Sequence, residues 1–283
     1  MPPRHLKPTL FVKATKQVMN LLPDRLGFPI LQRVSAQIDR SPLTEAQSEA
    51  LVTADRLTLA GRPLYRWGQG PTVLLVHGWA GRAGQMAPLA ATLAAHGFQA
   101  IAFDVRGHGE APGRTTSWRT FQRDIIRVTQ ALERPLFACV GHSAGALSLM
   151  ASRQQNGLAA EKFVGICSPS HPFPAIDFIR RILAPSDGVM EAYRKDVASQ
   201  FGCTWAELEA AHPYYGAGPE TLLVYDTGDK IVPLEEGIKI QGYSSGIHLS
   251  TLGPCGHTKI LSDPTLGATV LDFLLEKTSS KAK

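Results

Sequence analysis

Cysteine is scarce in this chain, and its cysteines do not occur in pairs. Cys139, Cys167, Cys203 and Cys255 are far apart in the sequence, so there is no Cys-x-x-Cys motif of the kind that holds zinc or performs redox chemistry. Disulfide-stabilised secreted domains concentrate many more cysteines in a short chain. We therefore expect free thiols, no metal centre and a location in the reducing cytoplasm.

Long apolar runs are also absent. A helix that crosses a bilayer needs about 18 consecutive apolar residues, and no stretch of this sequence approaches that length. The basic N-terminus lacks the apolar core of a secretory signal. It also has no serine before Ser35, whereas mitochondrial transit peptides are rich in serine. These absences agree with the expected cytoplasmic location.

Acidic residues are few at the start of the chain. Residues 1–40 carry seven Lys and Arg side chains but only two acids, and this excess equals the net charge of +5 for the whole chain. The rest of the chain is therefore neutral overall. Because the excess is confined to one segment and is not interleaved with aromatic residues, we expect no nucleic-acid partner.

Residues 1–55 are predicted to form a helical arm. Apolar residues at helical spacing predict two amphipathic helices, and Ser41 followed by Pro42 predicts the N-terminal cap of a third. We expect the arm to dock on the rest of the chain. The alternative is that residues 1–40, being both basic and apolar, make a weak contact with a membrane surface or a lipid.

From residue 56 onward, apolar strands alternate with helices. The segment RLTLAGRPLYRW alternates around Ala60-Gly61 and predicts a β-hairpin. Further strands are predicted at 73–76, 100–105, 137–140, 163–167, 222–225 and 247–252, and helices at 85–96, 118–132, 144–155 and 264–277. Near-continuous Val, Ile, Leu and Phe strands between helices are typical of an α/β fold with a parallel sheet covered on both faces.

This alternation breaks over residues 168–220. The stretch contains six prolines and two short helical segments between two predicted strands. We interpret it as a cap or lid over the strand ends. Its large apolar residues, such as Phe173, Trp205 and Tyr214, favour a substrate with an apolar portion, although packing within the cap would also explain them.

Ser143 is the candidate nucleophile. It lies in Gly141-His142-Ser143-Ala144-Gly145, between an apolar strand and a helix-forming run, which is the context of a nucleophile elbow. The alternative is a glycine turn with an incidental serine, because this pattern alone is loose. We expect the neighbouring His142 to contact the substrate.

A serine nucleophile needs a base that is oriented by a third group. His257, in GPCGHTKIL, follows the last predicted strand and is the candidate base. Asp229, in LLVYDTGDKIVP, lies just beyond a strand end and is the candidate acid. These residues follow the chain order Ser, Asp, His that accompanies a nucleophile elbow. We expect Asp226, three residues before Asp229, to cap the strand end or the turn.

An oxyanion hole needs two backbone N–H groups beside the nucleophile. In VLLVHGWAGRAGQ, Gly78 and Gly81 permit a sharp loop that would turn the N–H of Trp79 toward the site. The N–H of Ala144 is the second candidate donor. We expect the Trp79 side chain to line the acyl pocket and bind substrate, with packing under the cap as the alternative.

Five motifs now stand in order: VHGWAG, DVRGHGEA, GHSAG, TGDKIVP and GHTKIL. In order and approximate spacing the chain resembles the α/β-hydrolase family, and in particular its serine esterases and thioesterases. The likeness covers residues 56–280, about four-fifths of the chain. It implies a mostly parallel sheet with helices on both faces, a small inserted helical cap, and a structural turn at 104–109. Members with an aspartate nucleophile, such as haloalkane dehalogenases and epoxide hydrolases, differ because this chain has Ser143.

We therefore expect a cofactor-independent serine hydrolase. It would cleave a small-molecule carboxylic ester or thioester through an acyl-enzyme on Ser143, like a carboxylesterase. Two alternatives stay open at this point. One is carbon–carbon bond hydrolysis or perhydrolysis with the same triad, since a fold does not fix a reaction. The other is a non-catalytic ligand-binding protein with a hydrolase-like pocket. The sequence indicates neither the acyl chain, nor the leaving group, nor the oligomeric state.

Overall fold

A computed structural model of the chain describes residues 10–40, 42–244 and 246–276. Ser41, the first nine residues of the predicted arm and positions 277–280 of the predicted hydrolase domain lie outside these ranges. No helix within them has both the length and the apolar content that a membrane span requires.

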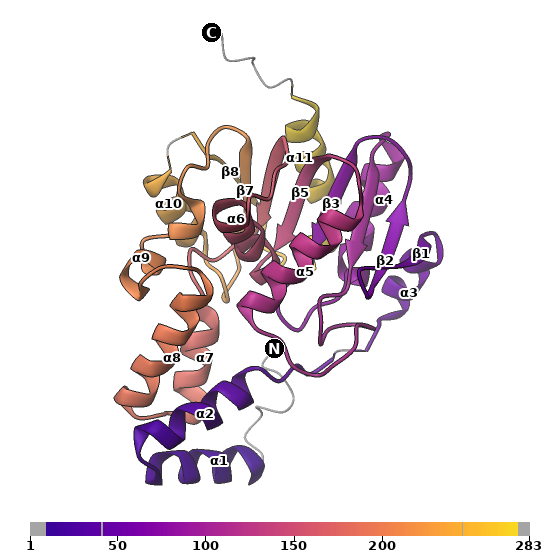
Figure 1. Ribbon diagram of the computed structural model, residues 1–283. Helices are drawn as coiled ribbons and strands as arrows, with labels where there is room; N and C mark the ends of the chain where they lie inside the picture. Colours follow the sequence, from indigo (N-terminus) through magenta and orange to yellow (C-terminus); the bar gives the residue numbers. More distant parts are fainter. Residues whose placement is uncertain (1–9, 41, 245, 277–283) are drawn as a thin grey trace.

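The centre of the molecule is an eight-stranded sheet with the order β1-β2-β4-β3-β5-β6-β7-β8 (Figure 1). Its strands are β1 (Asp55–Leu59), β2 (Arg62–Trp67), β3 (Thr72–Val76), β4 (Gln99–Phe103), β5 (Leu136–His142), β6 (Lys162–Ile166), β7 (Thr221–Asp226) and β8 (His248–Leu252). β1 and β2 form the predicted antiparallel hairpin, and all neighbours from β4 to β8 are parallel. The predicted α/β fold with a mostly parallel sheet is confirmed.

The strand order reverses at β3, which lies between β4 and β5. At such a reversal the loops that leave neighbouring strands separate to opposite faces of the sheet and open a crevice at the carboxyl ends. The loop after β3 carries Trp79, and the turn after β5 carries Ser143. The topology alone therefore brings the predicted nucleophile and the predicted oxyanion loop together.

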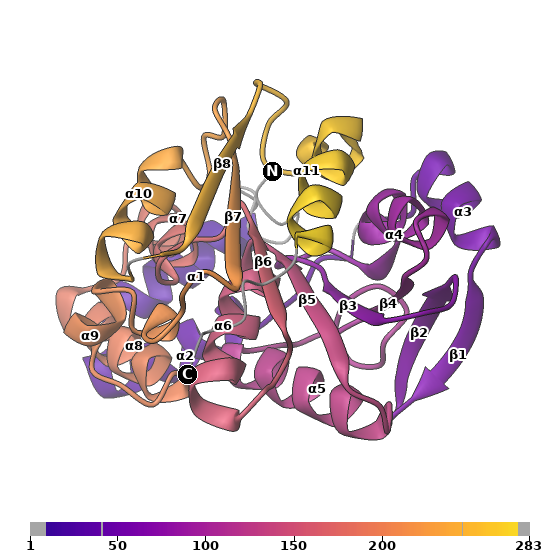
Figure 2. The ribbon, with the colours of Figure 1, turned by 90° about the horizontal axis from the view of Figure 1, so that it is seen from above.

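Helices cover both faces of the sheet (Figure 2). On one face lie α4 (Ala87–Ala95) and α11 (Pro264–Leu275), whose apolar residues pack with alternate strand residues. On the other face lie α5 (Trp118–Ala131), α6 (Ala144–Asn156) and α10 (Leu234–Tyr243). Every residue of β3, β4, β6 and β7 is buried, which explains why these strands are continuous apolar runs rather than alternating ones.

The segment between β6 and β7 forms a helical cap, as the prolines and helical segments predict. It contains α7 (Phe173–Leu183), α8 (Asp187–Gln200) and α9 (Trp205–Glu209). The cap stays attached to the body through buried hydrogen bonds. Gln122 Nε2 on α5 donates to the Gln200 carbonyl oxygen over 2.9 Å, and the Tyr225 hydroxyl on β7 donates to the Ser168 carbonyl oxygen.

The first two helices of the arm pack on the cap: α1 (Leu10–Leu21) contacts α7, and α2 (Asp24–Ser35) lies along α8 (Figure 1). The chain that follows α2 pairs with the body, where Ile38 N–H donates to Arg114 O over 2.9 Å and Thr116 N–H donates to Ala36 O over 2.8 Å. The arm thus docks on the rest of the chain, and contact of residues 1–40 with a membrane stays a prediction.

The third helix of the arm, α3 (Glu45–Val52), packs instead beside α4 on the body. Its N-cap is Thr44, whose hydroxyl accepts from the Gln47 N–H while the Gln47 side chain accepts from the Thr44 N–H. This reciprocal capping box places the helix start three residues later than the predicted cap at Ser41, a position outside the described residues.

Candidate active site

Ser143 occupies the sharp turn between β5 and α6. Its backbone φ of 51° and ψ of −118° lie in a region that side-chain-bearing residues rarely adopt, at a cost of about 1–3 kcal/mol. Two backbone hydrogen bonds hold the turn: Ser143 N–H donates to Ile166 O over 2.9 Å, and Leu147 N–H donates to Ser143 O over 3.1 Å. The strain raises the hydroxyl above the sheet edge.

The two glycines of the elbow are required because α6 packs closely against the neighbouring backbone. A Cβ on Gly141 would lie 2.4 Å from the Ala146 nitrogen, and a Cβ on Gly145 would lie 2.4 Å from the carbonyl oxygens of Val76 and His77. Both distances are far inside van der Waals contact. The tight packing of α6 against β3 and β5 thus leaves no room for a side chain at position 141 or 145, two residues before and after Ser143.

His257 and Asp229 complete a hydrogen-bonded chain with Ser143. His257 Nε2 lies 3.0 Å from Ser143 Oγ, and His257 Nδ1 lies 2.6 Å from Asp229 Oδ2. An ionised Asp229 can only accept, so Nδ1 carries the hydrogen and the lone pair of Nε2 faces the serine. The structure therefore brings together the three residues predicted as nucleophile, base and acid.

The Asp229 carboxylate is held in its ionised form. Its side chain is fully buried, and burial by itself raises a carboxyl pKa. Hydrogen bonds from His257 and from the N–H groups of Val232 and Ile231 outweigh the burial, so the pKa of Asp229 is lower than usual. The two backbone bonds, 3.0 and 2.8 Å long, converge on Oδ1 and leave Oδ2 for the histidine.

Asp226 ties together the two loops that carry the acid and the base. Its Oδ1 accepts from Gly228 N–H over 2.8 Å, on the Asp229 loop. Its Oδ2 accepts from the N–H groups of Cys255 and Gly256, over 2.5 and 2.9 Å, on the His257 loop. The predicted role of Asp226 as a cap of the strand end and turn is confirmed, and the distance between the two loops depends on it.

His142 lies beneath His257 rather than facing an open pocket. Its Nε2 is 2.8 Å from the carbonyl oxygen of His257 and donates a hydrogen bond to it. Burial, followed by the neighbouring His257, lowers the pKa of His142 to about 3, so the ring is neutral at ordinary pH. Among the described residues Nδ1 has no hydrogen-bond partner. The structure thus gives His142 the task of holding the His257 backbone, where the sequence predicted substrate contact.

The loop after β3 runs directly beside the elbow. A Cβ on Gly78 would lie 3.2 Å from Ser143 Cβ, and Gly81 N–H closes the turn by donating to Gly78 O over 3.0 Å. His77 holds this loop in place: its Nε2 accepts from Val105 N–H over 3.1 Å, so its Nδ1 carries hydrogen and donates to Gly78 O over 2.8 Å. A small, fixed loop is therefore in contact with the nucleophile.

Both predicted oxyanion donors lie at this junction. Ala144 is the first residue of α6, where an N–H has no partner within the helix and the helix dipole favours negative charge. Among the described residues, neither Trp79 N–H nor Ala144 N–H donates to another backbone or side-chain group in the loops around the site. Both are free to bind an oxyanion.

Asp104 organises the neighbouring turn. This buried carboxylate accepts from Ala83 N–H and from Glu110 N–H, each over 2.8 Å. A Cβ on Gly109 would lie 2.2 Å from the same carboxylate, so the chain folds tightly around it. Segment 104–109 is thus the structural turn that the resemblance implied.

One cluster near the triad has donor types that could hold a metal ion. Cys167 Sγ, a carboxylate oxygen of Asp229 and a ring nitrogen of His257 lie within 4.8 Å of one another, and zinc binds such donors. Burial raises the pKa of the Cys167 thiol, and the nearby carboxylates of Asp229 and Asp226 raise it further. The metal-binding form is the thiolate, so the cluster fits better as packing behind the acid–histidine pair.

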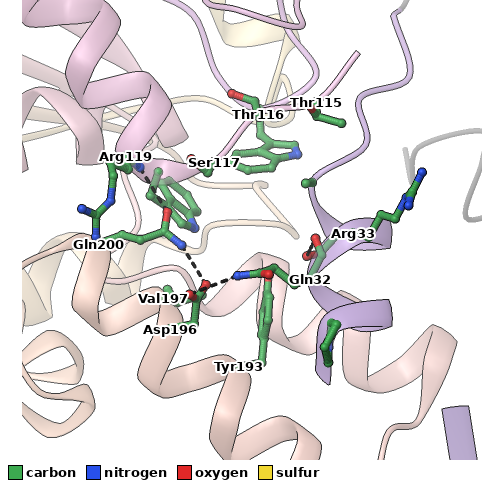
Figure 3. Close-up of a pocket in the computed structure, with 15 residues that line it drawn as sticks. Gln32, Arg33, Thr115, Thr116, Ser117, Arg119, Tyr193, Asp196, Val197 and Gln200 are labelled. Atoms are coloured by element: carbon green, nitrogen blue, oxygen red, sulfur yellow. Dashed lines mark hydrogen bonds between the residues drawn. The ribbon is translucent and has the colours of Figure 1, made fainter. Parts of the chain in front are cut away.

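A cavity of about 600 Å³ opens between α2, α5 and α8 and reaches Trp79 (Figure 3). The Trp79 ring stacks on Phe121 with centroids 5.8 Å apart and lies 5.1 Å from the Trp118 ring. Trp79 therefore lines this cavity and also packs beneath the cap. Ser143 is not among the lining residues, and the cavity and the loop after β3 share Trp79.

The arm supplies one wall of this cavity, which the sequence did not indicate. Figure 3 shows Asp196 of the cap between Gln32 of the arm and Gln200 of the cap. The Asp196 carboxylate accepts from Gln32 Nε2 over 3.2 Å and from Gln200 Nε2 over 2.9 Å. Gln200 Oε1 accepts from Arg119 N–H over 3.1 Å. Gln32 and Asp196 are 164 positions apart, so no local pattern could pair them.

Comparisons with known proteins agree with this architecture. A sequence model described as alpha/beta hydrolase fold matches residues 71–220. Over 85 residues the chain is 39% identical to the human serine hydrolase-like protein, and this stretch is 28% of the chain and 41% of that relative. The match therefore spans less than half of the relative's length.

Two solved structures show the same fold. The meta-cleavage product hydrolase from Pseudomonas fluorescens IP01 superposes with a TM-score of 0.57 at 18% identity, covering 77% of this chain and 96% of that one. The monoacylglycerol lipase from Paleococcus ferrophilus superposes with a TM-score of 0.55 at 19% identity, covering 75% and 98%. At such low identity the likeness concerns the fold alone.

Proposed function

The chain belongs to the alpha/beta hydrolase fold family, and from that premise we propose that it is a serine hydrolase acting on a small-molecule carboxylic ester or thioester. The observation that carries the proposal is the hydrogen-bonded chain from Asp229 through His257 to Ser143, with distances of 2.6 and 3.0 Å. A serine whose hydroxyl lies within hydrogen-bond distance of a histidine Nε2 can give up its proton as it attacks a carbonyl carbon.

In the proposed mechanism, Ser143 Oγ attacks the substrate carbonyl while His257 Nε2 accepts its proton. Asp229 keeps the hydrogen of His257 on Nδ1 and stabilises the imidazolium that forms. The N–H groups of Trp79 and Ala144 bind the oxyanion, and removing one such donor typically costs about 3–4 kcal/mol of transition-state stabilisation. His257 then protonates the leaving group, and water, activated by the same ring, hydrolyses the acyl-enzyme. The cycle needs no cofactor and no metal.

Neighbouring groups keep this relay in one geometry. Asp226 holds the acid and base loops together through three backbone N–H groups. His142 bonds the carbonyl of His257. His142 thus joins the proposal as a positioning residue, whereas the substrate-facing wall is assigned to Trp79 and Trp118 at the cavity.

A fluorophosphonate probe tests the proposal, because it reacts only with an activated serine. The folded chain is expected to gain one probe adduct on Ser143, located by peptide mass spectrometry. The Ser143→Ala variant should not be labelled. Ser148→Ala, in the same helix, is the matched control and should be labelled like the original chain. A folded chain that takes no label would overturn the proposal.

Substrate class is tested by a rate panel. We expect p-nitrophenyl esters from acetate to palmitate, with thioesters of the same acids, to be hydrolysed in a Ser143-dependent manner. Labelling of Ser143 without turnover of any ester or thioester would instead favour the carbon–carbon hydrolase alternative. Neither labelling nor turnover would favour the ligand-binding alternative.

A further inference from the structure

Three arginines form a ridge along α5. Arg119, Arg123 and Arg127 follow one another at intervals of four residues, so their side chains lie on one helix face. With a rise of 1.5 Å per residue, the ridge is about 12 Å long. All three are exposed, and none of their guanidinium groups forms an ion pair or hydrogen bond within the described part of the chain.

This ridge borders a groove of about 400 Å³ between α5, α6 and α8. Besides the three arginines, the groove is lined by Gln122, Ile126, Gln155, Asn156, Ser199 and Gln200. No carboxylate is among these residues. The groove thus offers three permanent cations together with amide and hydroxyl donors, and it has no built-in counter-ion.

The groove lies next to the cavity that Trp79 lines. Arg119 and Gln200 line both spaces, and Figure 3 shows them side by side on facing helices. Trp79, whose backbone N–H is a proposed oxyanion donor, also lines the cavity. The one carboxylate on the cavity wall, Asp196, already accepts from the amides of Gln32 and Gln200. The ridge therefore begins at Arg119, which borders the same cavity as Trp79.

We propose that the Arg119–Arg123–Arg127 ridge binds the phosphate groups of the substrate's leaving group, so that the substrate is an activated acyl compound whose leaving group carries more than one phosphate. Guanidinium groups bind phosphate oxygens in pairs of hydrogen bonds, and three of them over about 12 Å match an extended polyanion better than a single carboxylate. A simple fatty ester has no anionic group that the three arginines could bind.

The proposal rests on the proposed function and names its substrate class. With a thioester, Ser143 Oγ forms a C–O bond to the acyl carbon, the C–S bond breaks, and His257 gives the departing sulfur the proton that it took from Ser143. Water then cleaves the acyl-enzyme, and the products are a carboxylic acid and a free thiol. The phosphates stay intact and only anchor the leaving group.

The test compares one acyl group on two thiol carriers. Hexanoyl-coenzyme A carries three phosphates, whereas hexanoyl-N-acetylcysteamine presents the same thioester without charge. At low salt, kcat/KM for the coenzyme A ester is expected to be roughly tenfold higher or more, and the advantage should shrink in 0.5 M NaCl because exposed charges are then screened. Arg123→Gln and Arg127→Gln should each reduce kcat/KM for the coenzyme A ester roughly fivefold and leave the uncharged thioester unchanged.

Arg25→Gln is the matched control, since it removes an exposed arginine that lines neither space. It should leave both rates unchanged. An acyl glycerol phosphate, whose leaving group carries a single phosphate, is a third arm. Its rate should depend less on Arg123 and Arg127 than the rate of the coenzyme A ester, and an equal dependence would contradict a ridge that selects more than one phosphate.

Equal rates for the two thioesters, or an advantage that neither arginine variant alters, would overturn the ridge proposal while leaving the proposed function intact. Absence of turnover together with absence of fluorophosphonate labelling would overturn both. The uncharged thioester therefore separates a failure of the ridge from a failure of the triad.

Discussion

The catalytic edge of the sheet and the cover above it are held together by different means. At the edge, glycine contacts and buried or partly buried backbone hydrogen bonds position Ser143, Asp229 and His257. In the cover, formed by the cap and the arm, side chains far apart in sequence, such as Gln32 and Asp196, meet at an exposed surface. Under the proposed function, we expect the edge to fix the reacting geometry and the cover to influence which substrates enter.

This difference between the edge and the cover can be tested by experiment. Changes at the edge should affect kcat or global stability, whereas changes in the cover should affect KM and selectivity.

Replacing His257 by glutamine should have the largest effect. The amide cannot accept the Ser143 proton, so kcat for a p-nitrophenyl ester is expected to fall roughly 10⁴-fold. Steady-state kinetics measures the loss, and the circular dichroism spectrum should be unchanged. A fall of less than tenfold would show that another group acts as the base.

Replacing Gly145 by alanine should damage both folding and activity. The new Cβ would lie 2.4 Å from the carbonyl oxygens of Val76, at the end of β3, and His77, so α6 must move away from the sheet. Overpacking of this kind typically costs about 1–3 kcal/mol, and kcat should fall because the elbow moves with the helix. Urea unfolding measures the stability. Gly242→Ala, at a glycine with open space around it, is the control.

Acid should destabilise the edge through its buried histidines. Burial, and then His257, lowers the pKa of His142 to about 3 in the folded chain, whereas the unfolded value is about 6.5. Between these values the unfolded chain binds a proton that the folded chain does not, so the free energy of unfolding falls as the pH falls. His142→Gln keeps a donor for the His257 carbonyl and removes this titration, and its slope between pH 6 and 4 should be shallower by about 1.4 kcal/mol per pH unit.

Urea unfolding at pH 7, 6, 5 and 4 compares the two slopes. His171 provides the matching measurement in the cap, because burial and then Lys239 lower its pKa to about 4. His171→Gln should also flatten the profile, and over a narrower range. Parallel profiles for the original chain and His142→Gln would contradict the buried, neutral state of His142.

Replacing Gln32 by alanine should have the smallest effect. It removes an exposed hydrogen bond to Asp196 and one wall of the cavity. A hydrogen bond of this kind contributes about 0.5–1.5 kcal/mol, so KM should change about threefold while kcat and the fluorophosphonate labelling rate stay constant. A kcat that fell with KM unchanged would show that the arm acts on the catalytic edge itself.

Much of the fold and the meeting of Ser143, Asp229 and His257 could be predicted from the sequence, because both depend on local signals. Continuous apolar strands predict a covered parallel sheet, and glycines beside Ser143 predict an elbow whose steric need the structure then explains. Asp226 was assigned to a strand end for the same reason. The four predicted helix ranges of the body end within two residues of the observed ones, whereas α10 was not predicted.

The rest depends on contacts that no local pattern encodes. The side chain of His142 could turn either toward a pocket or toward the His257 loop, and only the position of that loop, 115 residues away, decides it. The arm shows the same limit: amphipathic spacing predicts helices, but it does not predict that α2 joins α8 while α3 joins α4. Arg119, Arg123 and Arg127 likewise form an ordinary charged helix face until α6 and α8 make a groove beside them.

The way the arm is fastened has a consequence for the timing of catalysis. Asp24 accepts from the Ser186 hydroxyl over 2.6 Å at one end of α2, and the chain after α2 is bonded to residues 114 and 116 of the body at the other. The arm is therefore a strap that runs from the cap to the body. A cap strapped in this way does not swing open as one piece unless the strap detaches first. If the proposed function holds, we expect the substrate to enter through the cavity between α2, α5 and α8 without a lid movement of the whole cap.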